Sequence, residues 1–413
     1  MSDPAAHVVI VGAGHAGGTA AALLRQYGHA GPITLVGEEP IPPYQRPPLS
    51  KAWLKGEADA DALTLKPLEF YAEHDIDFRP STRALSINRG AKTVALSDGS
   101  TVSYDALILA TGARAIALPI PGAELEGVMF LRTAADAELL KARIGPGKRL
   151  AVVGGGYIGL EVAASGRALG AEVVVLERET RLLARVACEA LSTFFKGYHE
   201  QHGVVFELGA DVAAFEGAKR GESGHVAGVR LANGRVIACD AVVVGVGAHP
   251  NDELARDCGL ETARGVVVDL DARSSDPSIF AIGDVAHRPM PIYGRMFRME
   301  SVPNALEGAK QAASAIAGRS APAGEVPWQW SDQYDLKLQI AGYAFDVDQI
   351  LLRGDPATAK FAVFHLRGDL VQSVEAINSP PEFMMGKQLI LGRKPVDKGR
   401  LADPSISMKE VAA

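Results

Sequence analysis

Two glycine-rich segments of one kind occur in this chain, and each follows a short apolar run. The apolar runs are residues 7–11 and 150–153, and the glycine-rich segments span residues 12–17 and 154–159. A buried strand, a Gly-x-Gly-x-x-Gly turn and a helix of small residues are together typical of a unit that binds a dinucleotide. One such turn is a weak signal. A tandem pair predicts two dinucleotides held face to face, with electrons passing between them.

The three glycines of each turn have separate tasks. The first allows the sharp bend, the second lets the backbone approach a pyrophosphate, and the third lets the helix pack closely on the strand. An acidic residue that binds ribose hydroxyls should follow about 20 residues later. Glu38 follows Gly17 by 21 residues and Glu177 follows Gly159 by 18, so both units are complete. We expect the helices at residues 18–27 and 160–170.

The composition limits the class of protein. The 413 residues suffice for two or three domains, and 47% apolar with 22% charged residues is typical of a globular chain. No apolar stretch reaches the roughly 18 residues of a membrane span, and the first residues lack the basic start of a secretion signal. The net charge of −7 argues against nucleic acid as the main partner. We therefore expect a cytoplasmic protein with no membrane contact.

The three cysteines, Cys188, Cys239 and Cys258, form no Cys-x-x-Cys pair. Because the first 187 residues hold no thiol, we predict that electrons leave to an external acceptor instead of a reactive cysteine in the first domain. No metal site is expected. His199 and His202 have the i, i+3 spacing of some metal ligands, but no further ligand is near in sequence, and we expect a solvated helix end.

Further apolar segments indicate how the two units are arranged. Residues 106–113 predict a buried strand, and residues 118–122 form a proline-rich connection between domains. The apolar strand that ends at Gly283 should rejoin the first sheet, so that one domain is inserted into the other. Strands at 336–340 and 360–366 and a helix near 383–390 predict a small separate α+β domain. The predicted domains are 1–114 with 244–325, 115–243, and 326–413.

With these residues assembled, the chain resembles the FAD-dependent ferredoxin reductases of the putidaredoxin reductase type, which supply electrons to bacterial monooxygenases and dioxygenases. The resemblance covers nearly the full length, and its more specific motifs lie at residues 46–51, 131–133, 154–161, 281–284, 300–305 and 330–334. It implies an α/β fold with tandem Rossmann-like FAD and NAD domains, as in glutathione reductase, and a C-terminal α+β domain. The first turn would hold FAD and the second NADH.

The resemblance also implies roles for single residues. Asp284 would bind the ribityl chain of FAD, with an ordinary turn aspartate as the alternative. The FAD pyrophosphate and adenosine ribose would bind at Gly12, Gly14, Ala16 and Glu38, and the flavin would be lined by Lys51, Ala84, Arg132, Val302 and Trp330, the last of which is otherwise a core residue. The implied FAD site further includes Ala13, His15, Gly17, Arg46, Ala110, Thr111, Gly112 and Glu300. The implied NAD site comprises Gly154, Gly156, Tyr157, Ile158, Gly159, Glu177, Arg185, Gly245 and Gly247.

Three residues are expected to act in catalysis. In the family that the chain resembles, residues matching Lys51 and Glu161 face each other near the reacting nitrogen of the flavin, where a positive charge would stabilise the reduced ring. Tyr157 would cover the flavin until the nicotinamide displaces it. The alternatives are two unrelated exposed charges and a packing tyrosine.

Glu177 determines the expected nicotinamide. Its carboxylate would accept hydrogen bonds from the ribose hydroxyls and repel a 2′-phosphate, which favours NADH over NADPH. Arg178 beside it leaves NADPH as an alternative.

The implied reaction is hydride transfer from NADH to FAD, followed by single-electron transfer to an external two-iron ferredoxin. Because ferredoxins are usually acidic, a net-acidic reductase needs a local basic face for docking. A merely solvated surface is the alternative, and we expect a monomer or weak homodimer. The residues expected on the docking face are Arg295, Arg298, Lys310 and Lys337.

Two other classes of function remain open. One is an NADH-dependent flavoprotein that reduces quinone, oxygen, peroxide or a disulfide, although the lack of an early cysteine argues against the thiol-dependent forms. The other is a redox signalling flavoprotein similar to apoptosis-inducing factor. The lack of a targeting segment and of basic extensions argues against the second class.

Overall fold

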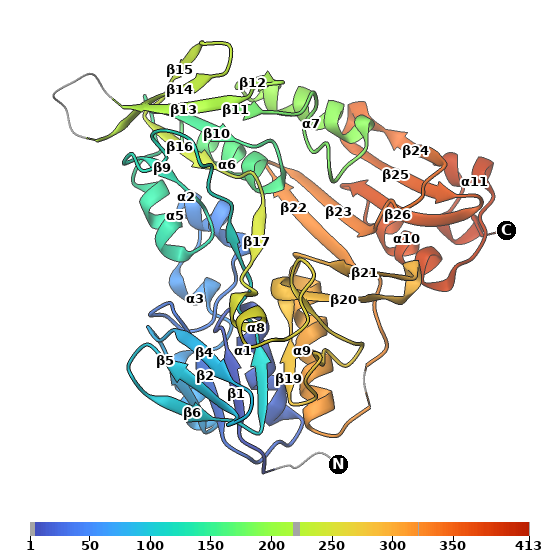
Figure 1. Cartoon of the computed structure of the whole chain (residues 1–413). Coiled ribbons are helices and arrows are strands. Elements are labelled where there is room, and N and C mark those ends of the chain that lie inside the picture. Colours follow the sequence, from blue (N-terminus) through green and yellow to red (C-terminus); the bar gives the residue numbers. More distant parts are fainter. Residues whose placement is uncertain (1–4, 218–223, 321, 413) are drawn as a thin grey trace.

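A parallel five-stranded sheet with the order β19-β7-β1-β2-β3 lies at the centre of the first unit (Figure 1). The computed structural model describes residues 5–217, 224–320 and 322–412. The apolar run after His7 forms the central strand, and its four side chains are buried, as the motif predicts. The strands are β1 (Val8–Val11), β2 (Ile33–Val36), β3 (Ile76–Arg79), β7 (Ala106–Leu109) and β19 (Ile279–Ala281).

Different elements cover the two faces of this sheet. One face carries α1 (His15–Gln26) and α9 (Val302–Ile316), whose buried alanines allow close packing. The other face carries a three-stranded antiparallel sheet. α1 begins three residues earlier than expected, because the last glycine of the turn already lies in the first turn of the helix. The strands of the small sheet are β4 (Ala84–Asn88), β5 (Thr93–Leu96) and β6 (Thr101–Ser103).

The second unit repeats this plan. Its parallel sheet has the order β12-β11-β10-β16-β9, and β10 holds the central place that β1 holds in the first unit. Two helices pack on one face and a three-stranded sheet on the other. The elements are β9 (Val128–Met129), α5 (Ala134–Lys141), β10 (Arg149–Val153), α6 (Tyr157–Ala168), β11 (Glu172–Glu177), β12 (Val204–Leu208), β13 (Val212–Gly217), β14 (Val226–Leu231), β15 (Val236–Ala238) and β16 (Ala241–Val244).

The chain leaves the first unit and later returns to it. β19 pairs in parallel with β7, which confirms the expected return of the apolar strand to the first sheet. The outgoing and returning segments lie side by side as an antiparallel pair, β8 (Ala113–Ala115) and β17 (Ala248–Pro250). β16 extends to Val244, close to the expected limit of the second unit at residue 243. The domain limits stay predictions.

The C-terminal residues form an antiparallel sheet with the order β22-β23-β26-β25-β24. One face packs on α10 (Pro380–Gly392), and the other packs on α7 (Glu189–Gln201) of the second unit (Figure 1). This region therefore shares an apolar core with the second unit, and is less separate than expected. Its strands are β22 (Trp328–Gln333), β23 (Leu336–Gly342), β24 (Gln349–Asp355), β25 (Lys360–Arg367) and β26 (Leu370–Ile377).

Shorter elements connect these layers. Across the described ranges, no helix is long and apolar enough to span a membrane. The first unit also contains the 3-10 helix η1 and the helices α2, α3 and α4, and a small sheet before α9 is built from β18, β20 and β21. These elements are η1 (Pro47–Ser50), α2 (Ala52–Lys55), α3 (Ala60–Leu63), α4 (Leu68–Glu73), α8 (Glu253–Asp257), β18 (Val266–Val267), η2 (Gly283–Val285), β20 (Ala286–Met290), β21 (Arg295–Arg298) and α11 (Lys398–Ala402).

Candidate active site

The two glycine turns have the same geometry. Gly12 and Gly154 have φ angles of +111° and +110°, which glycine adopts readily and other residues rarely do. A Cβ on Gly17 would lie 1.9 Å from the carbonyl oxygen of Gly12, and a Cβ on Gly159 would lie 2.1 Å from that of Gly154. The third glycine thus packs on the first in both turns, as predicted.

The second glycine of each turn faces open space. Within the described residues, no atom beyond the neighbouring residues in the chain lies within 4 Å of the position that a Cβ on Gly14 or Gly156 would take. Each of these glycines precedes a helix whose first N–H groups have no partner inside the helix, an arrangement that binds phosphate. At the first turn, Nδ1 of His15 is also buried without a hydrogen-bond partner in the described structure, and burial lowers the pKa of this ring. Both turns therefore fit a pyrophosphate.

Glu177 is held directly over the second turn. Its Oε2 atom accepts a hydrogen bond of 2.6 Å from the backbone N–H of Gly155, and its Oε1 atom accepts one of 2.8 Å from Glu179. Arg178 is 75% exposed and pairs with Glu179 at 3.6 Å. The carboxylate is thus fixed at the second turn, whereas the neighbouring arginine is exposed to solvent.

The other residues of the expected NAD site surround the same turn. A Cβ on Gly154 would lie 2.4 Å from the carbonyl oxygen of Gly245, so these backbones are in contact. Arg185 donates to the carbonyl oxygen of Val246 at 3.4 Å, next to Gly247. Ile158, the second residue of α6, is 49% exposed. The structure brings this predicted set together.

Lys51 and Glu161 meet, as the sequence predicts. Nζ of Lys51 lies 2.6 Å from Oε2 of Glu161, whose side chain is only 5% exposed. Lys51 follows η1 of the first unit, and Glu161 lies in α6 just after the second glycine turn. The ion pair therefore joins the two units between their dinucleotide turns, and the alternative of two unrelated exposed charges is wrong.

Two serines that sequence analysis missed complete the contacts of Glu161. Ser50 donates to Oε2 at 2.5 Å, and Ser331 of β22 donates to Oε1 at 2.6 Å. Both hydroxyls are buried, so they fix the carboxylate without adding charge. Ser331 lies in a motif that carries the family resemblance, but nothing in its spacing indicates Glu161, 170 residues away.

His199 contradicts the expectation of a solvated helix end. It is fully buried, and its Nε2 lies 2.7 Å from Oε1 of Gln333, which in turn donates to Ser331 at 3.0 Å. Burial lowers the pKa of His199 to about 4. The prediction failed because the C-terminal sheet packs on this end of α7, a contact that local sequence does not reveal. His202 is exposed, as expected.

Tyr157 lies between the second turn and the C-terminal sheet. Its hydroxyl donates to the carbonyl oxygen of Val186 at 3.2 Å, and burial raises its pKa well above the ordinary value. The ring packs against the apolar core shared by these two parts, and Gln329 of β22 is a further hydrogen-bond partner. Gln329 precedes Trp330, the tryptophan expected at the flavin, whose half-buried ring lies 5.5 Å from that of Trp328.

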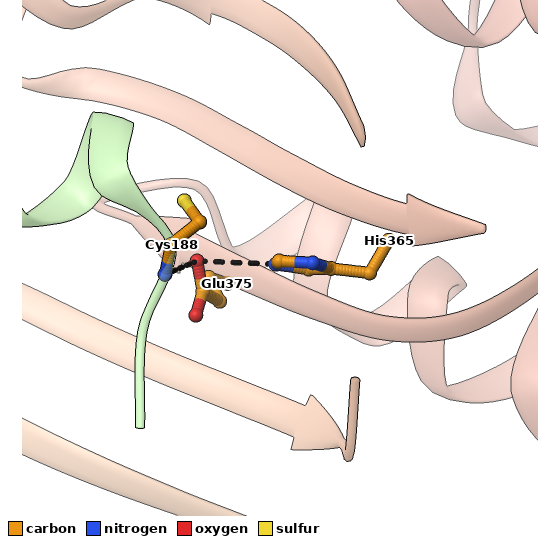
Figure 2. Close-up of side chains that lie close together, drawn as sticks. All are labelled: Cys188, His365 and Glu375. Carbon is orange, nitrogen blue, oxygen red and sulfur yellow. Dashed lines mark hydrogen bonds and ion pairs between the residues drawn. The ribbon is translucent and has the colours of Figure 1, made fainter. Parts of the chain in front are cut away.

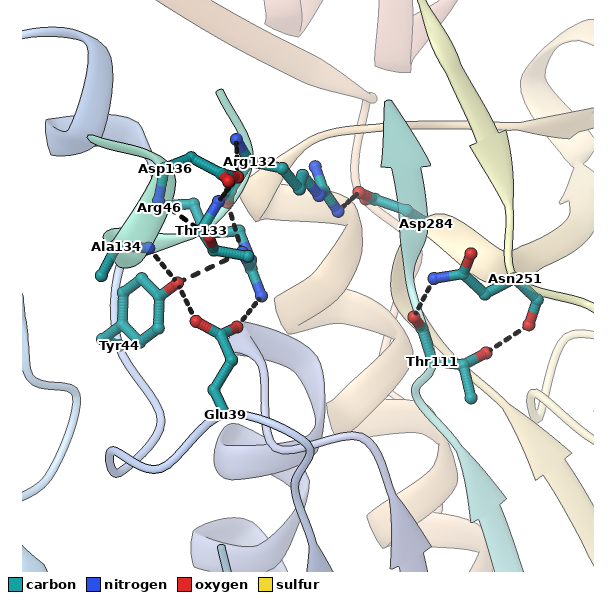
Figure 3. A network of polar contacts seen from close by, with 10 residues as sticks. All are labelled: Glu39, Tyr44, Arg46, Thr111, Arg132, Thr133, Ala134, Asp136, Asn251 and Asp284. Carbon is teal, nitrogen blue, oxygen red and sulfur yellow. Dashed lines mark hydrogen bonds and ion pairs between the residues drawn. The ribbon is translucent and has the colours of Figure 1, made fainter. Parts of the chain in front are cut away.

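Arg46 anchors the first unit to the second (Figure 3). Its guanidinium binds Glu39 at 2.7 Å and also donates to the backbone oxygen of Arg132. Tyr44, which sequence analysis missed, donates to Glu39 at 2.6 Å and accepts from the N–H of Ala134 at 2.9 Å. Arg46 is thus a structural link in addition to its predicted place at the FAD site.

Two further sets of polar contacts involve residues of the first unit (Figure 3). Arg132 donates to Asp284 at 2.8 Å, which joins two residues expected at the flavin and ribityl chain. Thr111 donates to the carbonyl oxygen of Asn251 at 2.7 Å, and the Asn251 amide donates back to Thr111 at 2.9 Å. These two hydrogen bonds fix the position of the segment of Ala110, Thr111 and Gly112. Asn251 carries no sequence signal because its partner lies 140 residues away.

The remaining predicted FAD residues lie at several places in the structure. Glu300 pairs with Arg298 at 2.6 Å, and Arg298 also donates to the carbonyl oxygen of Asp284, so Glu300 and the adjacent start of α9 at Val302 lie near Asp284. Glu38 is 73% exposed at the end of β2. Ala84 packs with Val36 of β2 in the core of the first unit, whereas Lys51 lies where the two units meet.

The four basic residues expected on a docking face differ in their surroundings. Arg298 is only 17% exposed, because it is held by Glu300 and Asp284. Arg295 pairs with Asp346 at 2.8 Å, and Lys310 lies 4.0 Å from Glu325. Lys337 is exposed at the start of β23. Arg298 is therefore largely buried and bonded within the protein, which argues against its predicted role in docking.

Comparisons with known proteins agree with this geometry. A family model described as pyridine nucleotide-disulphide oxidoreductase matches residues 6–309, and one described as reductase C-terminal matches residues 328–412. Probable ferredoxin reductase CtmF from Castellaniella defragrans is 52% identical over 98% of this chain and 98% of its own. Putidaredoxin reductase CamA from Pseudomonas putida is 40% identical over 98% of this chain and 97% of its own.

A solved structure is similar over the same length. The reductase in the crystal structure of the covalent putidaredoxin reductase–putidaredoxin complex has a TM-score of 0.95 and 40% identity, with 98% of this chain and 97% of that chain covered.

The family name includes a disulphide, yet in the described structure all three cysteines are free. Two dinucleotide turns, the ion pair between them and these matches lead to one conclusion. The chain belongs to the FAD-dependent and NAD(H)-dependent ferredoxin reductases of the pyridine nucleotide-disulphide oxidoreductase family.

Proposed function

We propose that this protein takes hydride from NADH onto FAD and passes single electrons to a two-iron ferredoxin that serves an oxygenase. The observation that carries the proposal is the ion pair of Lys51 and Glu161, which is buried between the two dinucleotide turns. When bound, FAD supplies the chemistry that divides a two-electron donor into single electrons. The chain supplies position and charge.

Each side chain then has a physical task. The ammonium of Lys51 provides positive charge where negative charge would develop, and Glu161 with its two serine donors keeps that ammonium in place. Tyr157 would exclude water from the flavin until nicotinamide binds. The backbone N–H of Thr82, two residues before Ala84, donates to the carbonyl oxygen of Gly37 at 2.8 Å. Because Gly37 precedes Glu38, we place Ala84 with Glu38 at the adenosine end of FAD, and not at the flavin.

We infer NADH as the donor from the position of Glu177. Its carboxylate is fixed over the second turn, where it would accept hydrogen bonds from ribose hydroxyls and repel a 2′-phosphate. Arg178 points to solvent, which argues against the NADPH alternative.

The docking face on the ferredoxin side is proposed around Lys310, Arg295 and Lys337. Lys310 and Arg295 are partly exposed and each lies near one acidic side chain, so a partner carboxylate would compete for them. Such contacts raise the rate of association and weaken with salt. The state of association and the cytoplasmic location stay predictions.

Acceptor specificity tests both the function and the docking face. With NADH as donor, the wild type should reduce a putidaredoxin-type ferredoxin faster than a quinone or peroxide, and Lys310→Glu should slow ferredoxin reduction about tenfold through repulsion. Ferricyanide reduction should stay unchanged in Lys310→Glu. Lys148→Glu, a reversal at an exposed lysine of the second unit, is the matched control.

Two outcomes would contradict these proposals separately. Equal slowing with ferredoxin and ferricyanide would remove the docking face but leave the function intact. Faster turnover with quinone or peroxide than with any ferredoxin would overturn the function itself.

A further inference from the structure

Three chemically different ligand groups meet where the second unit packs on the C-terminal sheet (Figure 2). They are the thiol of Cys188, the imidazole of His365 and the carboxylate of Glu375, and all three residues are buried. One ligand atom from each lies within 4.8 Å of the others. The mechanism described above uses none of them.

The fold brings this cluster together from distant parts of the chain. Cys188 is the residue before α7, and 177 residues separate it from His365. In the C-terminal sheet, Glu375 of β26 lies opposite Val363 of β25, and His365 lies two residues further along β25. Residues two apart on a strand share a face, so His365 and Glu375 both point toward the second unit.

The orientation of the His365 ring fits a metal site better than a hydrogen bond to Glu375. Nε2 of His365 is 3.3 Å from Oε2 of Glu375, yet across the described residues this buried nitrogen has no hydrogen-bond partner. The oxygen therefore lies to one side of the direction in which Nε2 would donate. Nitrogen and oxygen ligands of a tetrahedral zinc ion are about 3.4 Å apart, with the metal between them and neither directed at the other.

The three ligand groups make polar contacts with one another. Glu375 accepts a long bond of 3.5 Å from the backbone N–H of Cys188 (Figure 2), and its carboxylate also interacts with the Cys188 thiol. Buried polar atoms are usually satisfied, so the free Nε2 needs an explanation. A cation bound to nitrogen, sulfur and oxygen would provide it.

We propose that Cys188, His365 and Glu375 bind a zinc ion that fastens the second unit to the C-terminal sheet. Sulfur, imidazole nitrogen and carboxylate oxygen are the three ligand types of zinc in proteins, and a water molecule would complete a tetrahedral site. Val186, two residues before Cys188, accepts the hydrogen bond of Tyr157. The ion would therefore also stabilise the segment that holds this tyrosine beside the second glycine turn.

Metal retention tests the proposal directly. FAD-loaded protein is treated with a chelator, incubated with a small excess of zinc chloride, passed through gel filtration and analysed for zinc. The wild type should retain one equivalent per chain, and Cys188→Ser should weaken zinc binding about 100-fold or more. Cys239→Ser is the matched control, because Cys239 is also buried but belongs to no ligand cluster among the described residues, and it should retain zinc.

Cobalt provides a second readout that depends on the ligands. Cobalt(II) chloride added to the metal-free protein should produce a thiolate-to-cobalt absorption band in the difference spectrum, and the band should be missing in Cys188→Ser. If that variant loses FAD or precipitates, His365→Phe removes a ligand without placing a polar group in the core and decides the question. Equal zinc retention by the wild type and the ligand variants, or no cobalt band in the wild type, would overturn the proposal.

Discussion

At the scale of single residues, the contacts of Glu161 decide how charge is arranged between the dinucleotide turns. This carboxylate has three partners, since Lys51, Ser50 and Ser331 all contact it. Burying an ion pair is costly unless its remaining hydrogen bonds are made, and the two serines make them. The arrangement therefore holds one ammonium in a fixed position at the meeting point of the two units.

Removal of that ammonium should slow the chemical step. We predict that Lys51→Met lowers the rate of flavin reduction by NADH about 10- to 100-fold with little change in KM, because positive charge is lost only where negative charge develops. Stopped-flow absorbance at saturating NADH measures this. Lys55→Met, at a surface lysine paired with Glu57, is the control. A Lys51→Met enzyme that retains FAD and is reduced at the wild-type rate would exclude this role.

His199 makes stability depend on pH. Burial lowers its pKa to about 4, whereas the unfolded chain has a histidine pKa of about 6.5. As the pH falls from about 6.5 to 4, the unfolded chain takes up a proton that the folded protein does not, so stability is lost across this window. At pH 5 we expect the loss to be about 2 kcal/mol.

Urea unfolding of the holoenzyme at pH 7.5 and pH 5 measures that loss. His199→Gln should lose correspondingly less stability between the two pH values, and His202→Gln, at the exposed neighbour, should match the wild type. The same pH dependence in all three proteins would show that His199 does not titrate as inferred.

At the scale of elements, the two strand–turn–helix units share one geometry, and we propose that they bind different dinucleotides. A Cβ on Gly14 or Gly156 would enter open space, so alanine is tolerated by the fold at either position. The added methyl group would instead stand where a pyrophosphate has to approach. The two turns can therefore be tested one at a time.

We predict a separation of cofactor effects. Gly14→Ala should weaken FAD binding about 10- to 100-fold, from a steric cost of about 1–3 kcal/mol, and should leave NADH binding to FAD-loaded protein unchanged. Gly156→Ala should raise the KM for NADH and leave FAD content unchanged. FAD content by absorbance and NADH titration measure the two effects. Gly197→Ala in α7, also open at its Cβ position, should change neither, and loss of FAD in Gly156→Ala would contradict the assignment of the turns.

Sequence patterns predicted these elements well where they are local. The strand before each turn, the packing of Gly17 on Gly12 and the meeting of Lys51 with Glu161 were all expected, the last through the family resemblance. Contacts between distant segments could not be predicted. Ser331 lies 170 residues from Glu161, and the burial of His199 depends on a sheet that follows it by more than 100 residues.

At the scale of the whole molecule, the side chains to which we assign chemical roles lie mostly where two regions of the fold meet. The Lys51–Glu161 pair joins the first and second units, and Cys188 meets His365 where the second unit packs on the C-terminal sheet. Because the C-terminal sheet shares an apolar core with α7, we expect it to unfold together with the second unit.

Electron stoichiometry tests the central claim most directly. Under anaerobic conditions, the FAD-loaded protein is mixed with a limiting amount of NADH and an excess of oxidised two-iron ferredoxin, and both reduced ferredoxin and NAD⁺ are quantified. Our account predicts two reduced ferredoxins for each NADH consumed, since each ferredoxin accepts one electron. A reduced flavoprotein that persists beside oxidised ferredoxin would contradict it and would favour a signalling flavoprotein instead.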